Sequence, residues 1–151
     1  AACVNTEYCV RSRCLTGGAY NLASVNGVPS VLIERGQLSQ MPRDQVEQDK
    51  ADVINIMKYL GIIDGDPLIY DKQNLRETEM FSPASGCWYP DMHAGDSFRC
   101  GDRLGTIKDY FGEIKHEILA PENVMMLHQT ASLNIIEGGP MISYGIPDHT
   151  E

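Results

Sequence analysis

The sequence predicts an α+β fold, in which a short α/β portion precedes a small all-β module. Residues 43–60 repeat apolar side chains at helical spacing, whereas from about residue 74 onward short apolar runs alternate with Gly, Pro and Asp turns. The stretch "DGDPLIYDKQ", which is rich in turn residues, lies between these two patterns. We therefore expect two domains, residues 1–70 and residues 71–151.

The most regular pattern predicts a helix over residues 43–60. Asp44 in the first turn and Lys58 in the last turn match the polarity of the helix dipole. Gly61 follows as a helix stop. One face repeats apolar side chains at about 100° per residue, and its members are Val46, Val53, Ile54, Ile56, Met57 and Leu60.

A second, shorter helix is expected before this one, over residues 16–26. Thr16 is a suitable N-cap, and Gly27 is a suitable stop. The stretch "GVPSVLIERG" comes next, and its β-branched run predicts a core strand over residues 30–34.

The predicted strand ends on a carboxylate, Glu34, which is followed by Arg35. Neighbouring residues of a strand point to opposite faces, so these two side chains are not expected to pair with each other. The residues alone leave two interpretations open. Glu34 is either a solvated strand end or a carboxylate that a rigid strand delivers into a site.

Charge and hydropathy exclude several classes of partner. The formal net charge is 12 − 21 = −9, and a chain that neutralises phosphates needs clustered Lys and Arg, so nucleic acid is not an expected partner. No apolar run reaches the roughly 18 residues of a membrane helix, and no secretory signal opens the chain. We expect a cytoplasmic protein with no membrane partner.

The five cysteines are Cys3, Cys9, Cys14, Cys87 and Cys100, an odd count without a CxxC pair. This spacing suits neither a disulfide scaffold nor a zinc knuckle. We expect reduced structural thiols, with a Cys87–Cys100 bridge as the less favoured alternative.

The β-module contains two stretches that echo each other. "MHAGDSFRCGDRLGTI" and "LNIIEGGPMISYG" each place a glycine-containing turn before a strand. Between them, "ILAPENVMML" is expected to form a strand, a Pro turn and another strand. The two similar halves predict a small sandwich with pseudo-two-fold symmetry.

Three blocks, taken in order, resemble a known family. They are "NGVPSVLIERG" with the helix that ends in "YLGII", the block "GCWYPDMHAGDSFRCGDRLGTIKDYFGEIKHEILAPEN", and the closing "IIEGGPMISYG". Together they resemble the C-terminal half of a succinylglutamate desuccinylase/aspartoacylase family protein, a branch of the zinc carboxypeptidase-like hydrolases. The second block also resembles the barrel-sandwich hybrid of biotinyl and lipoyl carrier domains. This resemblance implies the end of an α/β zinc-hydrolase core followed by a barrel-sandwich-hybrid-like domain.

The resemblance implies a zinc-dependent amide hydrolase that acts on N-acyl amino acids or related amides. In such enzymes an HxxE pair and a later His hold the zinc on the N-terminal half, and a strand-end Glu deprotonates the metal-bound water. Glu34 in "VLIERG" stands at the matching position and is the implied catalytic base. Arg35 is expected at the surface or behind the site, and the β-domain is expected to close over the substrate entrance or to mediate a homo-oligomer.

The chain departs from the family at the metal site. None of its four histidines, His93, His116, His128 and His149, starts an HxxE motif. We expect no metal ligand and no bound cofactor here, and we expect the zinc on a missing N-terminal half. The opening "AACVNTEYCV" has no initiator Met, which fits a fragment or a processed product that is inactive alone.

Four residues of the β-module are assigned structural roles. Trp88 and Tyr89, which precede a proline, are expected to anchor a strand edge to the core rather than to form a ligand platform. Asp96 and Asp102 each follow a glycine and are expected to form turns.

Two other functions remain open. One is a non-enzymatic binding or assembly module, in which a β-sandwich is attached to a degenerate hydrolase remnant. The other is a stand-alone carrier domain. Lys108 and Lys115 flank "DYFGEI" but lack the Met-Lys presentation of a carrier lysine, so covalent cofactor attachment is not expected.

Overall fold

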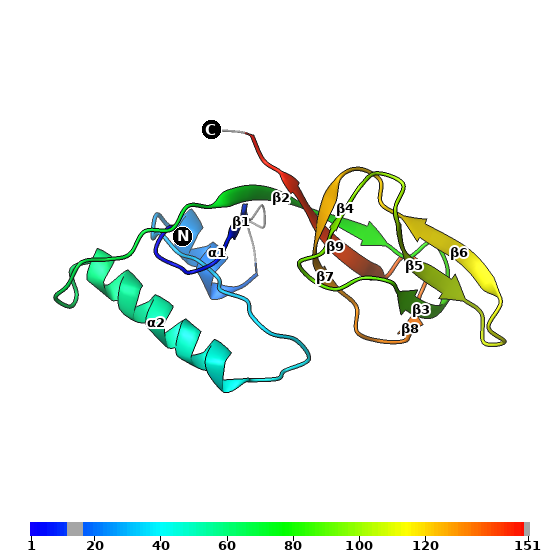
Figure 1. Cartoon of the computed structure of the whole chain (residues 1–151), viewed down its shortest axis with the longest axis horizontal. Helices are drawn as coiled ribbons and strands as arrows, with labels where there is room; N and C mark the ends of the chain where they lie inside the picture. Colours follow the sequence, from blue (N-terminus) through cyan, green and yellow to red (C-terminus); the bar gives the residue numbers. More distant parts are fainter. Residues whose placement is uncertain (12–16, 150–151) are drawn as a thin grey trace. The chain divides into compact units, whose positions relative to one another are not determined.

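The computed structural model describes residues 1–11 and 17–149, and the chain divides into two compact units, Ala1–Gln73 and Asn74–Glu151 (Figure 1). The first unit carries two helices and a short strand, and the second consists of strands. The predicted α+β class is confirmed. Two residues with predicted roles, Cys14 and the N-cap Thr16, lie outside the described residues.

The first unit contains β1 (Tyr8–Arg11), α1 (Ala19–Val25) and α2 (Arg43–Tyr59). Helix α2 begins after Pro42 and ends at the Leu60 C-cap, so the predicted helix is confirmed to within one residue. Helix α1 lies within the predicted range and begins after Gly18.

The most deeply buried side chains of α2 are not those of the apolar face that its sequence predicts. Its buried side chains are Asp52 and Asn55. By contrast, Val53 is 51% exposed, Ile54 47% and Leu60 61%. Within the first unit as described, the polar face of α2 packs against the rest of the chain. The apolar face is half-buried at three positions and exposed at the other three, which are Val53, Ile54 and Leu60.

The predicted core strand over residues 30–34 is wrong. Residues 28–35 have no regular secondary structure, and Val31 and Leu32 are exposed. A strand needs a neighbouring strand to accept and donate its backbone hydrogen bonds. No strand in the described ranges pairs with this segment, and polar side chains fix its course instead.

The second unit folds into two antiparallel sheets. The strands are β2 (Gln73–Phe81), β3 (Gly86–Pro90), β4 (Ser97–Phe98), β5 (Arg103–Lys108), β6 (Ile114–Leu119), β7 (Val124–Gln129), β8 (Asn134–Ile135) and β9 (Pro140–Pro147). Within this unit one sheet has the order β2-β9-β7-β4, and the other has the order β6-β5-β3-β8. Both sheets contribute to one core, in which Trp88, Leu104 and Ile107 meet Met126 and Met141.

The structural roles predicted for Trp88, Asp96 and Asp102 are confirmed, whereas the core-anchoring role predicted for Tyr89 is wrong, because this side chain is 43% exposed. Trp88 is 2% exposed in the core, and its indole N–H donates to Gln129 Oε1 at 3.2 Å. Asp96 Oδ2 accepts a hydrogen bond from the backbone N–H of His93, and Asp102 Oδ2 accepts one from Arg99, each at 2.8 Å. These are the side-chain-to-backbone bonds that close Asx-type turns.

The described cysteines are free thiols. Cys3 is buried, Cys9 and Cys87 are half-buried, and Cys100 is exposed. The alternative Cys87–Cys100 bridge is therefore not formed in the structure. Cys100 is held instead by a hydrogen bond from its thiol to the carbonyl of Pro121 at 3.3 Å.

Candidate functional site

Glu34 lies in the irregular segment that replaces the predicted strand. Its side chain is exposed, whereas both neighbours, Ile33 and Arg35, are half-buried. No ion pair of Glu34 is present in the part of the chain that the structure describes, and Arg35 does not pair with it. The carboxylate is therefore unengaged and faces outward from the first unit.

Arg35 turns in the other direction and fastens this segment to α2. Its guanidinium donates to Asp49 through Nη1, to Asp52 Oδ2 at 2.5 Å through Nη2, and to the carbonyl of Asn5 at 3.1 Å. Only 16% of the Arg35 side chain is exposed. Of the two places expected for Arg35, at the surface or behind the site, the surface is not the one observed, because the arginine is inserted between α2 and the N-terminal segment.

The partner carboxylate, Asp52, is bonded through both oxygens. Its Oδ2 binds Arg35, while Oδ1 accepts the backbone N–H of Asn5 at 2.8 Å and the side-chain amide of Gln48 at 3.3 Å. Only 2% of the Asp52 side chain is exposed. Three donors from three different residues therefore fix the position of this carboxylate.

The charge of the guanidinium is stabilised by the same contacts. Burial by itself lowers the pKa of Arg35, but the hydrogen bonds and charges of Asp52 and Asp49 outweigh burial and raise the pKa above its ordinary value. The hydrogen bonds of Arg35 and Asp52 hold together α2 and the segment that carries Glu34.

The chain turns sharply after Arg35. Gly36 has a φ of +79°, and a Cβ built there would lie 2.7 Å from Gln45 Oε1 and 3.3 Å from the carbonyl of Gln40. Leu38 and Ser39 also have positive φ, at 50° and 57°. Because a β-carbon is disfavoured at this φ and has little space, glycine suits the turn that leads the chain back to the start of α2.

Asn55 makes a second tie on the polar face of α2. Its side-chain amide donates to the carbonyls of Cys3 and Leu68, at 2.7 and 2.8 Å, and its Oδ1 accepts the backbone N–H of Leu68 at 2.8 Å. Asp49, Asp52 and Asn55 recur every three residues and so share one helix face. That polar stripe could be read from the sequence, but the stronger apolar pattern on the same helix obscured it.

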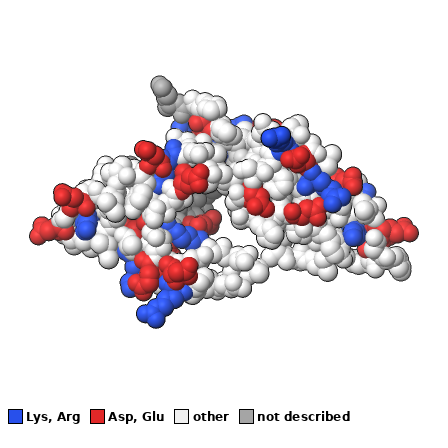
Figure 2. All heavy atoms as spheres, viewed as in Figure 1, with Lys and Arg blue, Asp and Glu red and all other residues white. Residues whose placement is uncertain are grey.

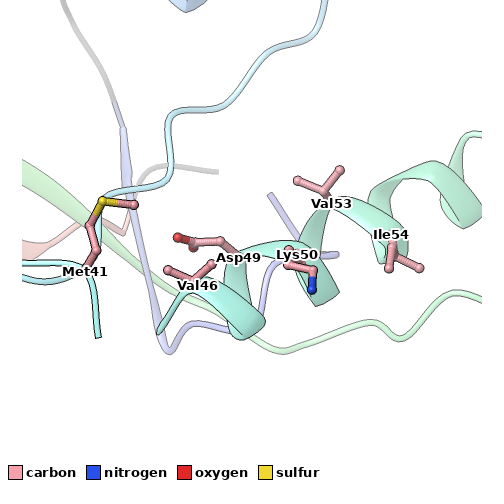
Figure 3. Close-up of a pocket in the computed structure, with 6 residues that line it drawn as sticks. All are labelled: Met41, Val46, Asp49, Lys50, Val53 and Ile54. Atoms are coloured by element: carbon pink, nitrogen blue, oxygen red, sulfur yellow. The ribbon is translucent and has the colours of Figure 1, made fainter. Parts of the chain in front are cut away.

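A shallow, mostly apolar depression lies along α2 beside the polar stripe and shares Asp49 with it (Figure 3). Met41, which precedes the helix, is 80% exposed, and Val53 and Ile54 are about half exposed. The lining residues are Met41, Val46, Asp49, Lys50, Val53 and Ile54.

The described residues contain no group of three or more His, Cys, Asp or Glu that could hold a metal ion. Two histidines of the second unit lie beside single carboxylates. His93 is 3.8 Å from Asp96, and His128 is 3.7 Å from Glu77. Neither arrangement provides the three protein ligands of a catalytic zinc.

Acidic and basic side chains are intermixed on the face shown in Figure 2, without a continuous basic surface. Among residues 1–11 and 17–149, no helix has the length and apolar character that crossing a membrane requires.

Comparison with known proteins gives matches among solved structures. No protein-family model and no curated protein matches the chain. The ectoine utilization protein EutE (DoeB) from Ruegeria pomeroyi is 20% identical with a TM-score of 0.81, covering 96% of this chain and 46% of its own. A succinylglutamate desuccinylase from Silicibacter is 18% identical with a TM-score of 0.78, covering 97% and 47%.

A third match is a succinylglutamate desuccinylase/aspartoacylase from Rhodobacter sphaeroides, which is 16% identical with a TM-score of 0.74. It covers 86% of this chain and 43% of its own. The chain thus spans less than half the length of each of these structures. Nearly all of it has the fold of a part of the succinylglutamate desuccinylase/aspartoacylase structures.

Proposed function

We propose that this chain is the portion of a zinc-dependent amide hydrolase that supplies the general base, Glu34, and an accessory β-domain. The substrate class is an N-acyl amino acid or a related amide. The zinc ligands belong to an N-terminal half outside this chain, so the chain by itself does not hydrolyse the amide. The second unit is proposed to be the barrel-sandwich-hybrid-like accessory domain.

The observation that carries the proposal is the likeness of fold. It extends over 86–97% of the chain in the three comparisons above, and it includes structures described as desuccinylases. The order of the three sequence blocks points to the same family. Within those blocks Glu34 is the carboxylate that follows "VLI", at the position of the family's base.

The uncovered surface of the first unit supports a missing half. The only buried apolar side chains among its described residues are Cys3 and Val4, whereas the second unit has a continuous core. Exposed apolar area of this extent marks an interaction surface. Its larger members are Val28, Val31, Leu32, Met41, Val53, Ile54, Tyr59, Leu60, Ile62, Leu68 and Ile69.

The proposed chemistry gives Glu34 one defined task. A bound zinc lowers the pKa of a water ligand towards about 7. The Glu34 carboxylate then accepts a proton from the attacking water and passes it to the nitrogen of the leaving amine. An exposed and unpaired carboxylate is suited to this task, because no partner competes for the proton.

The test is Glu34→Gln in the polypeptide that joins this chain to the sequence encoded before Ala1. Hydrolysis of N-succinyl and N-acetyl amino acids is expected to fall by about 10²–10⁴-fold, while bound zinc, measured by atomic absorption, is unchanged. Glu47→Gln is the matched control, since Glu47 is an exposed carboxylate that pairs with Lys50 on α2.

Two results would refute the proposal. One is a gene that encodes no HxxE motif and no further His before Ala1. The other is full turnover by the Glu34→Gln protein. Either result would favour the alternative of a non-enzymatic binding or assembly module.

A further inference from the structure

We propose that Arg35 is the positioning residue for Glu34, because its guanidinium holds the segment that carries the proposed base against α2. This inference rests on the function proposed above and adds to it the device that fixes the base. The sequence suggested that a core strand would act as the stiff support. In the structure residues 30–34 form no strand, and the contacts of Arg35 fix the course of this segment.

The contacts of Arg35 fulfil this role. They join the segment to two other parts of the first unit, to Asp49 and Asp52 on α2 and to the carbonyl of Asn5 near the N-terminus. Contacts in different directions from one planar group fix both the position and the orientation of the backbone that carries it. Asp52 is itself fixed by Asn5 and Gln48, so the anchor is rigid.

The alternation of burial assigns complementary roles to adjacent residues. Arg35 is turned into the unit, while Glu34, one residue earlier, is exposed. The hydrogen bonds from Arg35 to α2 therefore determine the direction in which the Glu34 carboxylate points. Gly36 completes the arrangement, because its positive φ turns the chain back directly after the anchor. "Glu-Arg-Gly" thus combines the base, its anchor and a turn.

Loss of the anchor is expected to lower turnover without removing any group that touches the substrate. A displacement of about 1 Å at a reacting group costs about 10²-fold in rate. We expect Arg35→Met to lower kcat by about 10- to 100-fold, with KM changed by less than about 3-fold. Arg35→Lys places one point charge where a planar fork had several partners, so its kcat should be intermediate.

The decisive measurement compares two backgrounds in the joined polypeptide described above. A residue that acts only through Glu34 has no further effect once Glu34 has been replaced. Arg35→Met should therefore lower kcat in the native protein and leave the residual rate of Glu34→Gln unchanged. An equal fractional loss in both backgrounds would overturn the proposal, because Arg35 would then act on the substrate or on folding.

A second readout needs neither zinc nor turnover. In the chain itself, Arg35→Met should lower the backbone ¹⁵N order parameters of residues 33–36 from about 0.85 to below about 0.6, while those of the β-strands of the second unit are unchanged. If Arg35→Met loses its helical circular dichroism, Arg35→Lys takes its place in both experiments. Unchanged order parameters in residues 33–36 would also overturn the proposal.

The outcomes separate this inference from the proposed function. Full activity of Glu34→Gln refutes the role of Glu34 and with it the function. Loss of activity in Glu34→Gln together with native kcat in Arg35→Met and Arg35→Lys refutes only the role of Arg35.

Discussion

The buried pair of Arg35 and Asp52 gives a sharp test of how the first unit is held together. Two aspartates bind the same guanidinium from one face of α2, but their burial differs. Half of the Asp49 side chain is exposed, compared with 2% of Asp52. Asp52→Ala and Asp49→Ala each remove an aspartate carboxylate from the same helix, so their difference reports the burial of Asp52 together with its bonds to Asn5 and Gln48.

The magnitudes follow from the contacts. Removing one partner of a buried ion pair costs about 3–5 kcal/mol, and Asp52→Ala also leaves the Asn5 N–H without its acceptor. Arg35 keeps Asp49 and the Asn5 carbonyl, and alanine favours the helix by about 0.5 kcal/mol, so we expect a net loss of about 2–4 kcal/mol. Asp49→Ala should lower the free energy of unfolding by less than about 1 kcal/mol, because half-exposed ion pairs contribute little.

The fold provides separate signals for the two units. Both described helices lie in the first unit, so circular dichroism at 222 nm in urea reports mainly on it. The chain has one tryptophan, Trp88 in the core of the second unit. Asp52→Ala should move the helical transition by about 1 M urea and leave the fluorescence transition in place. An Asp49→Ala effect as large as that of Asp52→Ala would refute the reasoning.

Two further predictions concern the second unit. Gly105→Ala would place a Cβ 2.5 Å from Trp88 Cη2 and 2.5 Å from the carbonyl of Tyr89. This overpacking should lower the free energy of unfolding by about 1–3 kcal/mol. An unchanged midpoint of the fluorescence transition in urea would contradict this. Burial raises the pKa of Tyr144, with a smaller contribution from Glu122, so the unfolded state loses this proton first and stability falls as pH rises above about 10. Tyr144→Phe should weaken that fall between about pH 9.5 and about pH 11, and equal slopes for the two proteins would rule the assignment out.

The boundaries of α2 could be predicted from the sequence, but its orientation could not. Apolar periodicity, Asp44, Lys58 and Gly61 are all local signals, and local signals fix where a helix begins and ends. Which face is buried depends on what the rest of the chain offers. Here the N-terminal segment and the Arg35 segment offer polar groups to α2, so Asp52 and Asn55 are buried and Val53 is not.

The strand over residues 30–34 failed for a related reason. Its β-branched sequence is suited to a sheet interior, but a strand is not a local structure, since it exists only through its neighbours. The turns at Asp96 and Asp102 were predictable because each one is closed within four residues. The network of Arg35 with Asp49, Asp52 and Asn5 joins residues up to 47 apart in sequence. No single sequence motif predicts this network.

The two errors have one explanation. The first unit has a β-branched segment and an apolar helix face, and both of these need apolar partners. Its sequence is therefore typical of a unit that belongs to a larger core. In the described residues of this unit those partners are absent, and polar ties fix much of its conformation, among them the contacts of Arg35 and Asn55. The same ties explain how Glu34 keeps a defined place without a sheet. A half that covered the apolar depression on α2 would also touch Asp49, which lines that depression and binds Arg35. The anchor of the proposed base and the proposed docking surface thus meet at Asp49.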